Sequence, residues 1–221
     1  MQFLSDSHGC EGWKGEMAAR ICAFDWSHTE LGPLDRWPAS LCCAVQMMLA
    51  SPLPMVMLWG RAGYMIYNDA YSEFAGGRHP YLLGVPVELG WPEVAEFNRH
   101  VVDTCLAGGT LSFRNKELVL LRDGVPEDVW MDLYYSPVAN DEGRPSGVMA
   151  MVVETTELVR SEQLRQAAEE AFRADNERVR LALNAGALLG SFVWDVKNNV
   201  LSADERFART FSYPPDHDLS N

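Results

Sequence analysis

One stretch, residues 111–156, limits the possible folds of this chain more than any other. Within it, residues 129–136 alternate apolar and other side chains with the period of two that a β-strand shows. Residues 147–153 are instead apolar at both odd- and even-numbered positions. This predicts a strand in the middle of a sheet with a covering layer on each face. The polar run 140–143, which ends in glycine, predicts a turn between these two strands.

The remaining segments predict an α+β fold around an antiparallel sheet. Residues 118–121 end at a turn over 122–124, so three successive strands form a meander. A helix over 40–50 carries an apolar stripe of Leu41, Val45, Met48 and Leu49, and is expected to cover one face of the sheet. Two more strands, one small helix and one longer helix are expected over 55–59, 64–67, 70–75 and 92–107. The small helices are expected on the other face, where they leave room for a cavity.

Charge and cysteine content restrict the partners and the compartment. The net charge is −13, which argues against nucleic acid and anionic membrane surfaces as partners. No apolar run approaches the roughly 20 residues of a membrane span, and the N-terminus lacks the pattern of a signal peptide. The five cysteines are Cys10, Cys22, Cys42, Cys43 and Cys105. Their odd number and the lack of C-x-x-C favour free thiols in a reducing cytoplasm.

Residues 157–180 contain no glycine or proline and predict a long exposed helix. Leu164, Ala168, Phe172 and Val179 form an apolar seam along it, interrupted at 175–176. We expect this seam to pair with a second copy in a parallel homodimer, because mixed Glu and Arg residues flank it. The alternative is a linker helix that packs on its own domain as a monomer.

The chain resembles a bacterial PAS sensor domain of the kind found at the front of signal-transducing histidine kinases. Phrases spread over residues 16–160 carry the resemblance: Phe24-Asp25-Trp26-Ser27, Leu31-Gly32-Pro33, Trp37-Pro38-Ala39-Ser40-Leu41, Trp59-Gly60, Tyr67-Asn68-Asp69-Ala70-Tyr71, His79-Pro80, Trp91-Pro92-Glu93, Tyr135-Ser136-Pro137 and Glu154-Thr155-Thr156-Glu157. The segment from Arg180 to Asp195 resembles the opening of a second PAS domain, so the sequence is expected to be part of a longer protein.

The resemblance implies a five-stranded antiparallel sheet in the order 2-1-5-4-3. It also implies that Glu154 and Thr156 couple the last strand to the outgoing helix, although the family more often has Asp in the first position. The expected division is an N-terminal tail and flanking segment over 1–38, the PAS domain over 39–156, a coiled-coil linker over 157–186, and the truncated second domain over 187–221.

The residues predict no catalysis. The chain has no phosphate-binding loop, dinucleotide-binding motif or zinc-protease motif, and its histidines and cysteines lack metal-ligand spacing. Flavin-sensing relatives carry an Asn-Cys-Arg-Phe-Leu-Gln motif where this chain has Gly76-Gly77-Arg78-His79-Pro80, which argues against a flavin adduct. Nothing supports a haem site; His100 is expected to be structural or solvent-facing, with a haem ligand or proton donor as the alternative.

Two classes of function stay open. The first is a sensor whose cavity binds a small molecule and whose linker helix biases an output domain. Its expected cavity wall is Tyr67, Trp91, His100, Tyr135 and Met149. The second is an interaction and dimerisation module with a filled core and no ligand. The output domain is expected to be a histidine kinase, with a phosphatase or a cyclic-dinucleotide enzyme as the alternatives.

Overall fold

The computed structural model describes residues 10, 12–122, 125–185, 190–198 and 200–211. The chain divides into two compact units, Met1–Val159 and Arg160–Asn221. Residues 123–124 of the predicted turn lie outside the described residues, as do residues 1–9 and 11 of the expected N-terminal tail.

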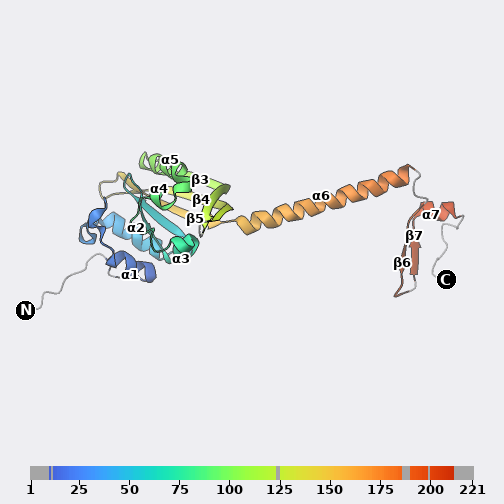
Figure 1. Cartoon of the computed structure of the whole chain (residues 1–221), viewed down its shortest axis with the longest axis horizontal. Helices are drawn as coiled ribbons and strands as arrows, with labels where there is room; N and C mark the ends of the chain where they lie inside the picture. Colours follow the sequence, from blue (N-terminus) through green and yellow to red (C-terminus); the bar gives the residue numbers. More distant parts are fainter. Residues whose placement is uncertain (1–9, 11, 123–124, 186–189, 199, 212–221) are drawn as a thin grey trace, which may run out of the picture. The chain divides into compact units, whose positions relative to one another are not determined.

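The first unit is built on one antiparallel sheet (Figure 1), whose five strands lie in the order β2-β1-β5-β4-β3. The strands are β1 (Met55–Trp59), β2 (Tyr64–Tyr67), β3 (Leu111–Arg122), β4 (Val125–Ala139) and β5 (Pro145–Glu154). The predicted fold class, strand order and central position of β5 are confirmed. The turn before β5 closes with a hydrogen bond from the Gly143 N–H to the Asn140 carbonyl, and Gly143 has the positive φ that favours glycine.

Short helices cover one face of this sheet. They are α3 (Asp69–Ala75), η3 (Gly76–Arg78), α4 (Val87–Gly90), η4 (Pro92–Val94) and α5 (Ala95–Leu106). Pro92 therefore begins a 3-10 turn, and the long α-helix starts three residues later than the sequence pattern predicts. Val101 and Cys105 of α5 are fully buried, as expected for its inner stripe.

The helix α2 (Ala39–Leu49) covers the opposite face and packs on β1, β2 and β4. Its Leu41, Val45 and Met48 side chains are buried, as predicted. Met57 and Ile66 are fully buried and alternate with residues of the cavity side, so they point toward this second layer. The outward side chains of β5, such as Met149 and Met151, are only half-buried, because an 11-residue helix covers only part of the sheet.

The segment before α2 belongs to the first unit rather than forming a flanking tail. It contains α1 (Glu16–Ala23), η1 (Trp26–His28) and η2 (Leu34–Arg36). Met17, Ile21 and Trp26 are almost completely buried in the same core as the sheet. The expected flanking segment therefore packs on the first unit, because it buries large apolar side chains that a free tail would expose.

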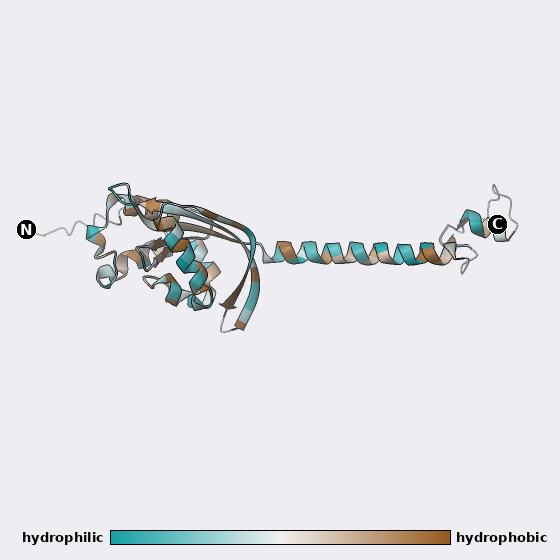
Figure 2. Ribbon diagram, turned by 90° about the horizontal axis from the view of Figure 1, so that it is seen from above, coloured by the Kyte–Doolittle hydropathy of each residue, from teal (hydrophilic) through white to brown (hydrophobic). Residues whose placement is uncertain are grey.

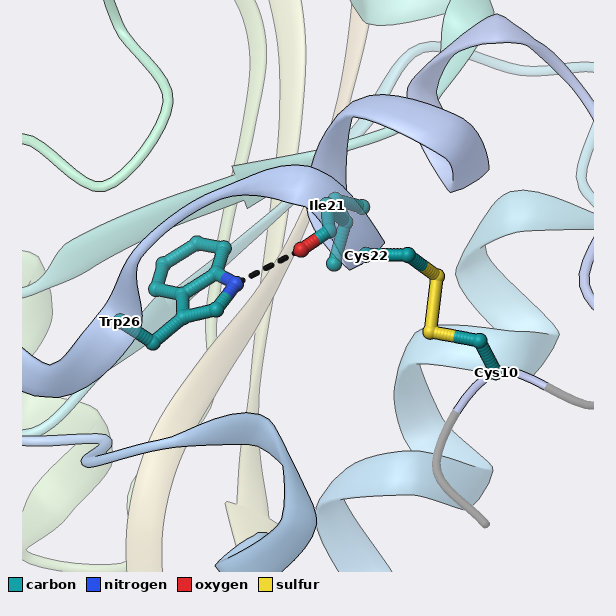
Figure 3. Close-up of a disulfide and its surroundings, with 4 residues drawn as sticks. All are labelled: Cys10, Ile21, Cys22 and Trp26. Atoms are coloured by element: carbon teal, nitrogen blue, oxygen red, sulfur yellow. Dashed lines mark hydrogen bonds between the residues drawn. A yellow bond between two sulfur atoms is a disulfide. The ribbon is translucent and has the colours of Figure 1, made fainter. Parts of the chain in front are cut away.

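Two of the cysteines expected to be free are joined in a disulfide (Figure 3). Cys10 pairs with Cys22 on α1, and their Cα atoms lie 6.4 Å apart. On the next turn, the Trp26 indole N–H donates to the Ile21 carbonyl over 2.8 Å. The sequence could not reveal the pair, because folding brings residue 10 back onto α1. Cys42, Cys43 and Cys105 are free, and the cysteine count no longer argues for a reducing compartment.

The second unit contains most of the long helix α6 (Thr156–Asn184), followed by β6 (Phe192–Asp195), β7 (Val200–Ala203) and α7 (Glu205–Thr210). The predicted hairpin is confirmed, with Phe192 opposite Ala203. Its Phe192, Val193 and Trp194 side chains are exposed, because a two-stranded piece with one short helix cannot form a core. In the described part of the chain, none of the helices combines the length and the apolar character that a membrane span requires.

Candidate functional site

An apolar cavity of about 50 Å³ lies between the sheet and the short helices of the first unit. Residues of β1, β3, β4 and β5 form its floor, and α3, α4, η4 and α5 form its walls. The lining residues are Val56, Leu58, Tyr71, Phe74, Val87, Trp91, Val94, Phe97, Asn98, Leu118, Leu120, Met131, Leu133, Tyr135, Ala150 and Val152.

Trp91 and Tyr135 lie in the cavity wall, as the sequence predicts. The other three expected wall residues, Tyr67, His100 and Met149, do not line the cavity. Met149 has the opposite parity to Ala150 and Val152, so it points to the α2 side of the sheet. His100 is exposed, because it lies on the outer face of α5.

Tyr67 is buried on the cavity side of β2, next to the cavity rather than in its wall. Its hydroxyl lies 3.1 Å from Nδ1 of His79, and burial raises its pKa to about 12. His79 also lies 3.7 Å from a carboxylate oxygen of Glu16 on α1. His79 therefore lies between Tyr67 of the sheet and Glu16 of α1.

Sequence reasoning missed Tyr71, Phe74 and Asn98 as wall residues. Tyr71 and Phe74 lie three residues apart on α3, so both point inward from one face of the helix. The ring centroids of Phe74 and Trp91 are 5.8 Å apart, and those of Phe97 and Tyr135 are 6.2 Å apart. The spacing on α3 was a readable signal, whereas the polar Asn98 offered none.

Trp91 is fixed in place by an ion pair behind it. The Arg78 guanidinium lies 4.3 Å above the indole ring and donates to a Glu93 carboxylate oxygen over 2.8 Å. The same Glu93 oxygen accepts a hydrogen bond from the Leu121 N–H of β3 over 2.9 Å. Because both charged side chains are largely buried, this pair holds the cavity-lining turn against the edge strand.

Glu154 and Thr156 meet at the exit from β5, as the resemblance implies. The Thr156 hydroxyl donates to the Glu154 carboxylate over 2.9 Å and accepts from the Trp130 N–H over 3.1 Å. The Trp130 carbonyl accepts from the Thr155 N–H over 2.7 Å. The first turn of α6 is thereby attached to β4, whose Met131, Leu133 and Tyr135 line the cavity.

A second contact, between β3 and the start of α6, was not predicted from the sequence. Asn115 lies at a bulge between Phe113 and Lys116 of β3 and has a φ of 45°, a conformation that Asn tolerates better than most residues. Its N–H donates to the Asp132 carboxylate over 2.8 Å, and its side-chain oxygen accepts from the Thr155 hydroxyl over 2.9 Å. β3 therefore also contacts the start of α6.

The four residues of the predicted helix seam are exposed along α6. Leu164, Phe172 and Val179 are exposed large apolar side chains, and Ala168 is exposed as well. Figure 2 shows α6 as mostly hydrophilic, with separated apolar positions. The structure contains a single chain, so the pairing stays a prediction.

A family model described as PAS fold matches residues 51–160. Residues 51–160 are a PAS domain. The match covers the five-stranded sheet, the cavity and the first turn of α6. The match begins after α2.

A curated relative of the chain is "Probable diguanylate cyclase DgcE" of Escherichia coli strain K12. It is 27% identical over 166 residues, which is 75% of this chain and 14% of that protein. The chain thus spans only about 14% of the length of this relative.

Solved structures similar to the chain include other PAS domains. The PAS domain of Bordetella pertussis BvgS is 18% identical, with a TM-score of 0.43 over 60% of this chain and 97% of that one. A sensory box sensor histidine kinase from Vibrio cholerae is 16% identical, with a TM-score of 0.35 over 52% of this chain and 90% of that one.

Among the described residues, no group of three or more His, Cys, Asp or Glu side chains is arranged to hold a metal ion. The cavity lining contains no pair of a nucleophile and a base. What the arrangement provides is a small apolar binding space, and two of the strands that line it, β3 and β4, also contact the start of α6.

Proposed function

We propose that this chain is the sensor part of a longer signalling protein, in which occupation of the PAS cavity changes the position of α6. The observation that carries the proposal is that strands β3 and β4 contribute residues both to the cavity lining and to the contacts with the start of α6. Leu118 and Leu120 of β3 and Met131 of β4 line the cavity, while Asn115 and Trp130 of the same strands contact the start of α6. A ligand that moves these strands would therefore shift the base of the helix.

The helix suits the transmission of such a shift. No glycine or proline lies between β5 and residue 180, so no flexible joint absorbs the movement. We propose that α6 pairs with the α6 of a second copy through Leu164, Ala168, Phe172 and Val179. The polar pair Asp175-Asn176 interrupts this seam, which would permit more than one packing of the two helices.

The output is proposed to be a cyclic-dinucleotide enzyme beyond the given sequence. The support is the relative named as a probable diguanylate cyclase, whose similarity covers 75% of this chain. A sensor histidine kinase is the second candidate, because the short sequence motifs of the first unit resemble those of PAS domains at the front of such kinases. A cytoplasmic location accords with either output and is part of the proposal.

The Phe172→Glu variant tests the dimeric linker. Phe172 is 68% exposed in the single chain, so the change should leave the first unit folded and weaken association by placing two charges in the seam. Ala174→Glu is the matched control, because residue 174 lies on the opposite side of the helix. Light scattering at roughly tens of micromolar, the range of a weak-to-moderate association, together with circular dichroism, measures both variants. A monomeric parent chain, or a dimer that Phe172→Glu does not weaken, would contradict the proposal.

A ligand-free interaction module is the competing function. It predicts that no compound raises the thermal stability of the first unit. Native mass spectrometry of protein purified from cells, followed by a thermal-shift screen, distinguishes the two, since a sensor should show a bound species or a stabilising compound.

A further inference from the structure

The cavity lining carries no charge, which limits the molecules that it can hold. None of its sixteen residues is Asp, Glu, Lys, Arg or His. Burial raises the pKa of the Tyr71 and Tyr135 hydroxyls, so both stay neutral at physiological pH. An ion in this cavity would lose its hydration without meeting an opposite charge.

One buried carboxamide in the wall is left unpaired. Asn98 of α5 is 8% exposed and lines the cavity together with Val94, one helical turn before it. Among the described residues, none forms a hydrogen bond with the Asn98 carboxamide, and neither its oxygen nor its nitrogen is completely enclosed. The Tyr71 hydroxyl, in contrast, is paired within the wall: burial raises its pKa, and a hydrogen bond with the Trp91 side chain partly offsets that rise.

A carboxamide presents a donor and an acceptor side by side. Its NH₂ group donates and its oxygen accepts, so a molecule with the reverse arrangement can form two hydrogen bonds with it, as asparagine does with the edge of adenine. A buried polar group left unpaired destabilises the folded state. Water can fill this role, but a ligand that displaces the water must supply both the donor and the acceptor to bind as well.

The volume sets the size of the ligand. A water molecule needs roughly 10–15 Å³ of cavity, so a cavity of about 50 Å³ holds roughly three to five waters. An organic molecule that fits has a similarly small number of heavy atoms. A flavin or a haem would require the walls to move apart.

We propose, on the basis of the sensor function above, that the cavity binds a small uncharged amide through the Asn98 side chain. The ligand N–H donates to the Asn98 oxygen, and the ligand carbonyl accepts from the Asn98 NH₂ group. The apolar remainder of the ligand packs on aliphatic side chains of the lining, such as Val94 and Leu133. Primary amides, lactams and ureas carry the N–H and the carbonyl on the same side and belong to this class, whereas carboxylates and charged amines do not.

Three probes with the same planar shape and equal numbers of heavy atoms separate the contributions of donor, acceptor and charge. They are acetamide, acetone, which lacks the N–H donor, and the anion acetate. Each is titrated into the ¹⁵N-labelled 221-residue chain while the side-chain NH₂ resonances are followed. Acetamide should shift the Asn98 resonances and saturate at roughly millimolar concentration, as expected for so small a ligand. Acetone should bind roughly two- to tenfold more weakly, the effect of one hydrogen bond, and acetate should not bind.

The Asn98→Leu variant assigns these resonances and removes both hydrogen bonds while keeping a side chain of similar size. It should weaken acetamide roughly tenfold or more, the effect of two hydrogen bonds, and weaken acetone less. His100→Leu is the matched control, because it introduces the same side chain on the exposed side of the same helix and should change neither affinity. The comparison of the three probes on the parent chain needs no variant and stands even if Asn98→Leu does not fold.

Several results would overturn the assigned ligand class. These are equal affinity for acetamide and acetone, saturable binding of acetate, or an acetamide affinity that Asn98→Leu leaves unchanged. The absence of saturable acetamide binding would also overturn it and would mean that the cavity holds only water. A larger or charged molecule found by native mass spectrometry would overturn the class while supporting the sensor function. Failure of the sensor function itself has a different signature, in which acetamide binds but amide exchange in the first turn of α6 stays unchanged.

Discussion

Single side chains join separate elements of the first unit, and Asn68 is an example that joins α2, β1 and α3. Its amide nitrogen donates to the carbonyls of Met48, Ser51 and Leu53, over 3.1, 3.1 and 2.7 Å. Its side-chain oxygen accepts from the backbone N–H groups of Met55 and Tyr71. One buried residue thus joins the end of α2, the start of β1 and the N-terminus of α3.

Replacing Asn68 by Ala should destabilise the first unit by about 3 kcal/mol, because it leaves several buried backbone groups unpaired. Denaturant unfolding followed by circular dichroism measures the change. Asn140→Ala is the control, since that amide accepts two hydrogen bonds in an exposed turn, and it should cost clearly less. Equal losses for the two variants would contradict the role given to Asn68.

Asp141 caps α2 from the turn between β4 and β5. Its carboxylate accepts from the Ser40 N–H over 2.8 Å and the Ala39 N–H over 3.3 Å. The cap comes from a distant turn because Pro38 precedes the helix and its side chain has no acceptor. The Ser40 side chain and these backbone N–H groups hold the pKa of the Asp141 carboxyl below its ordinary value.

This pKa shift gives Asp141 a pH-dependent effect. A lowered folded-state pKa means that the stabilisation is complete above the unfolded value, about 3.9, and is lost as the pH falls through the folded value. The melting temperature of Asp141→Asn should therefore lie below that of the parent chain at pH 7. The gap should close as the pH falls below about 4. A gap that stays constant over this range would show that the charge of Asp141 plays no part.

At the scale of whole elements, α2 packs on β1 and β2 from the side opposite the cavity. Val45 is completely buried and Leu49 is partly buried against the core. Met47, on the same helix, is 71% exposed. The helix thus separates into a buried face and a solvent face, as its apolar stripe predicts.

Changing both Val45 and Leu49 to Asp should destabilise the first unit by about 4 kcal/mol or more, because it removes packing and buries charge. Met47→Asp places the same charge on the same helix and should change stability by less than about 0.5 kcal/mol. Thermal and denaturant unfolding measure both variants. Unchanged stability in the double variant would refute the packing of α2 described above.

At the scale of the whole molecule, the first unit contains its own core. Its buried residues run from Met17 to Thr156, and the division between units falls at Val159. The exit contacts of Thr155 and Thr156 therefore stay with the PAS domain. The second unit exposes large apolar side chains on its hairpin and along α6.

A fragment of residues 1–159 should fold and unfold cooperatively as a monomer, because it keeps the complete core and loses the proposed dimer helix. Light scattering gives its mass, and near-UV circular dichroism reports its packed aromatic side chains. Ending the chain at residue 153 should instead reduce the melting temperature, since it removes the Thr155 and Thr156 contacts to β3 and β4. A dimeric 1–159 fragment would place the main association surface on the first unit.

The sequence by itself determined the sheet, most of its helices and the family. Three local patterns carry this information: the period-two alternation in β4, the apolar run of β5 and the apolar stripe of α2. Each pattern shows which side chains of the element are to be buried. It also placed Trp91 and Tyr135 in the cavity wall, while the role of Glu154 and Thr156 at the start of α6 came from the resemblance to the family.

Only the tertiary structure decided which side chains share the cavity and which residues distant in the sequence meet. Tyr67, His100 and Met149 were wrongly expected in the wall, because the type of a residue does not reveal the direction of its side chain. The Cys10–Cys22 bond, the Asn115–Thr155 contact and the Asp141 cap on α2 join residues 12, 40 and about 100 positions apart. Such contacts form only when distant segments of the chain fold against each other, and no local pattern of residues predicts which segments meet.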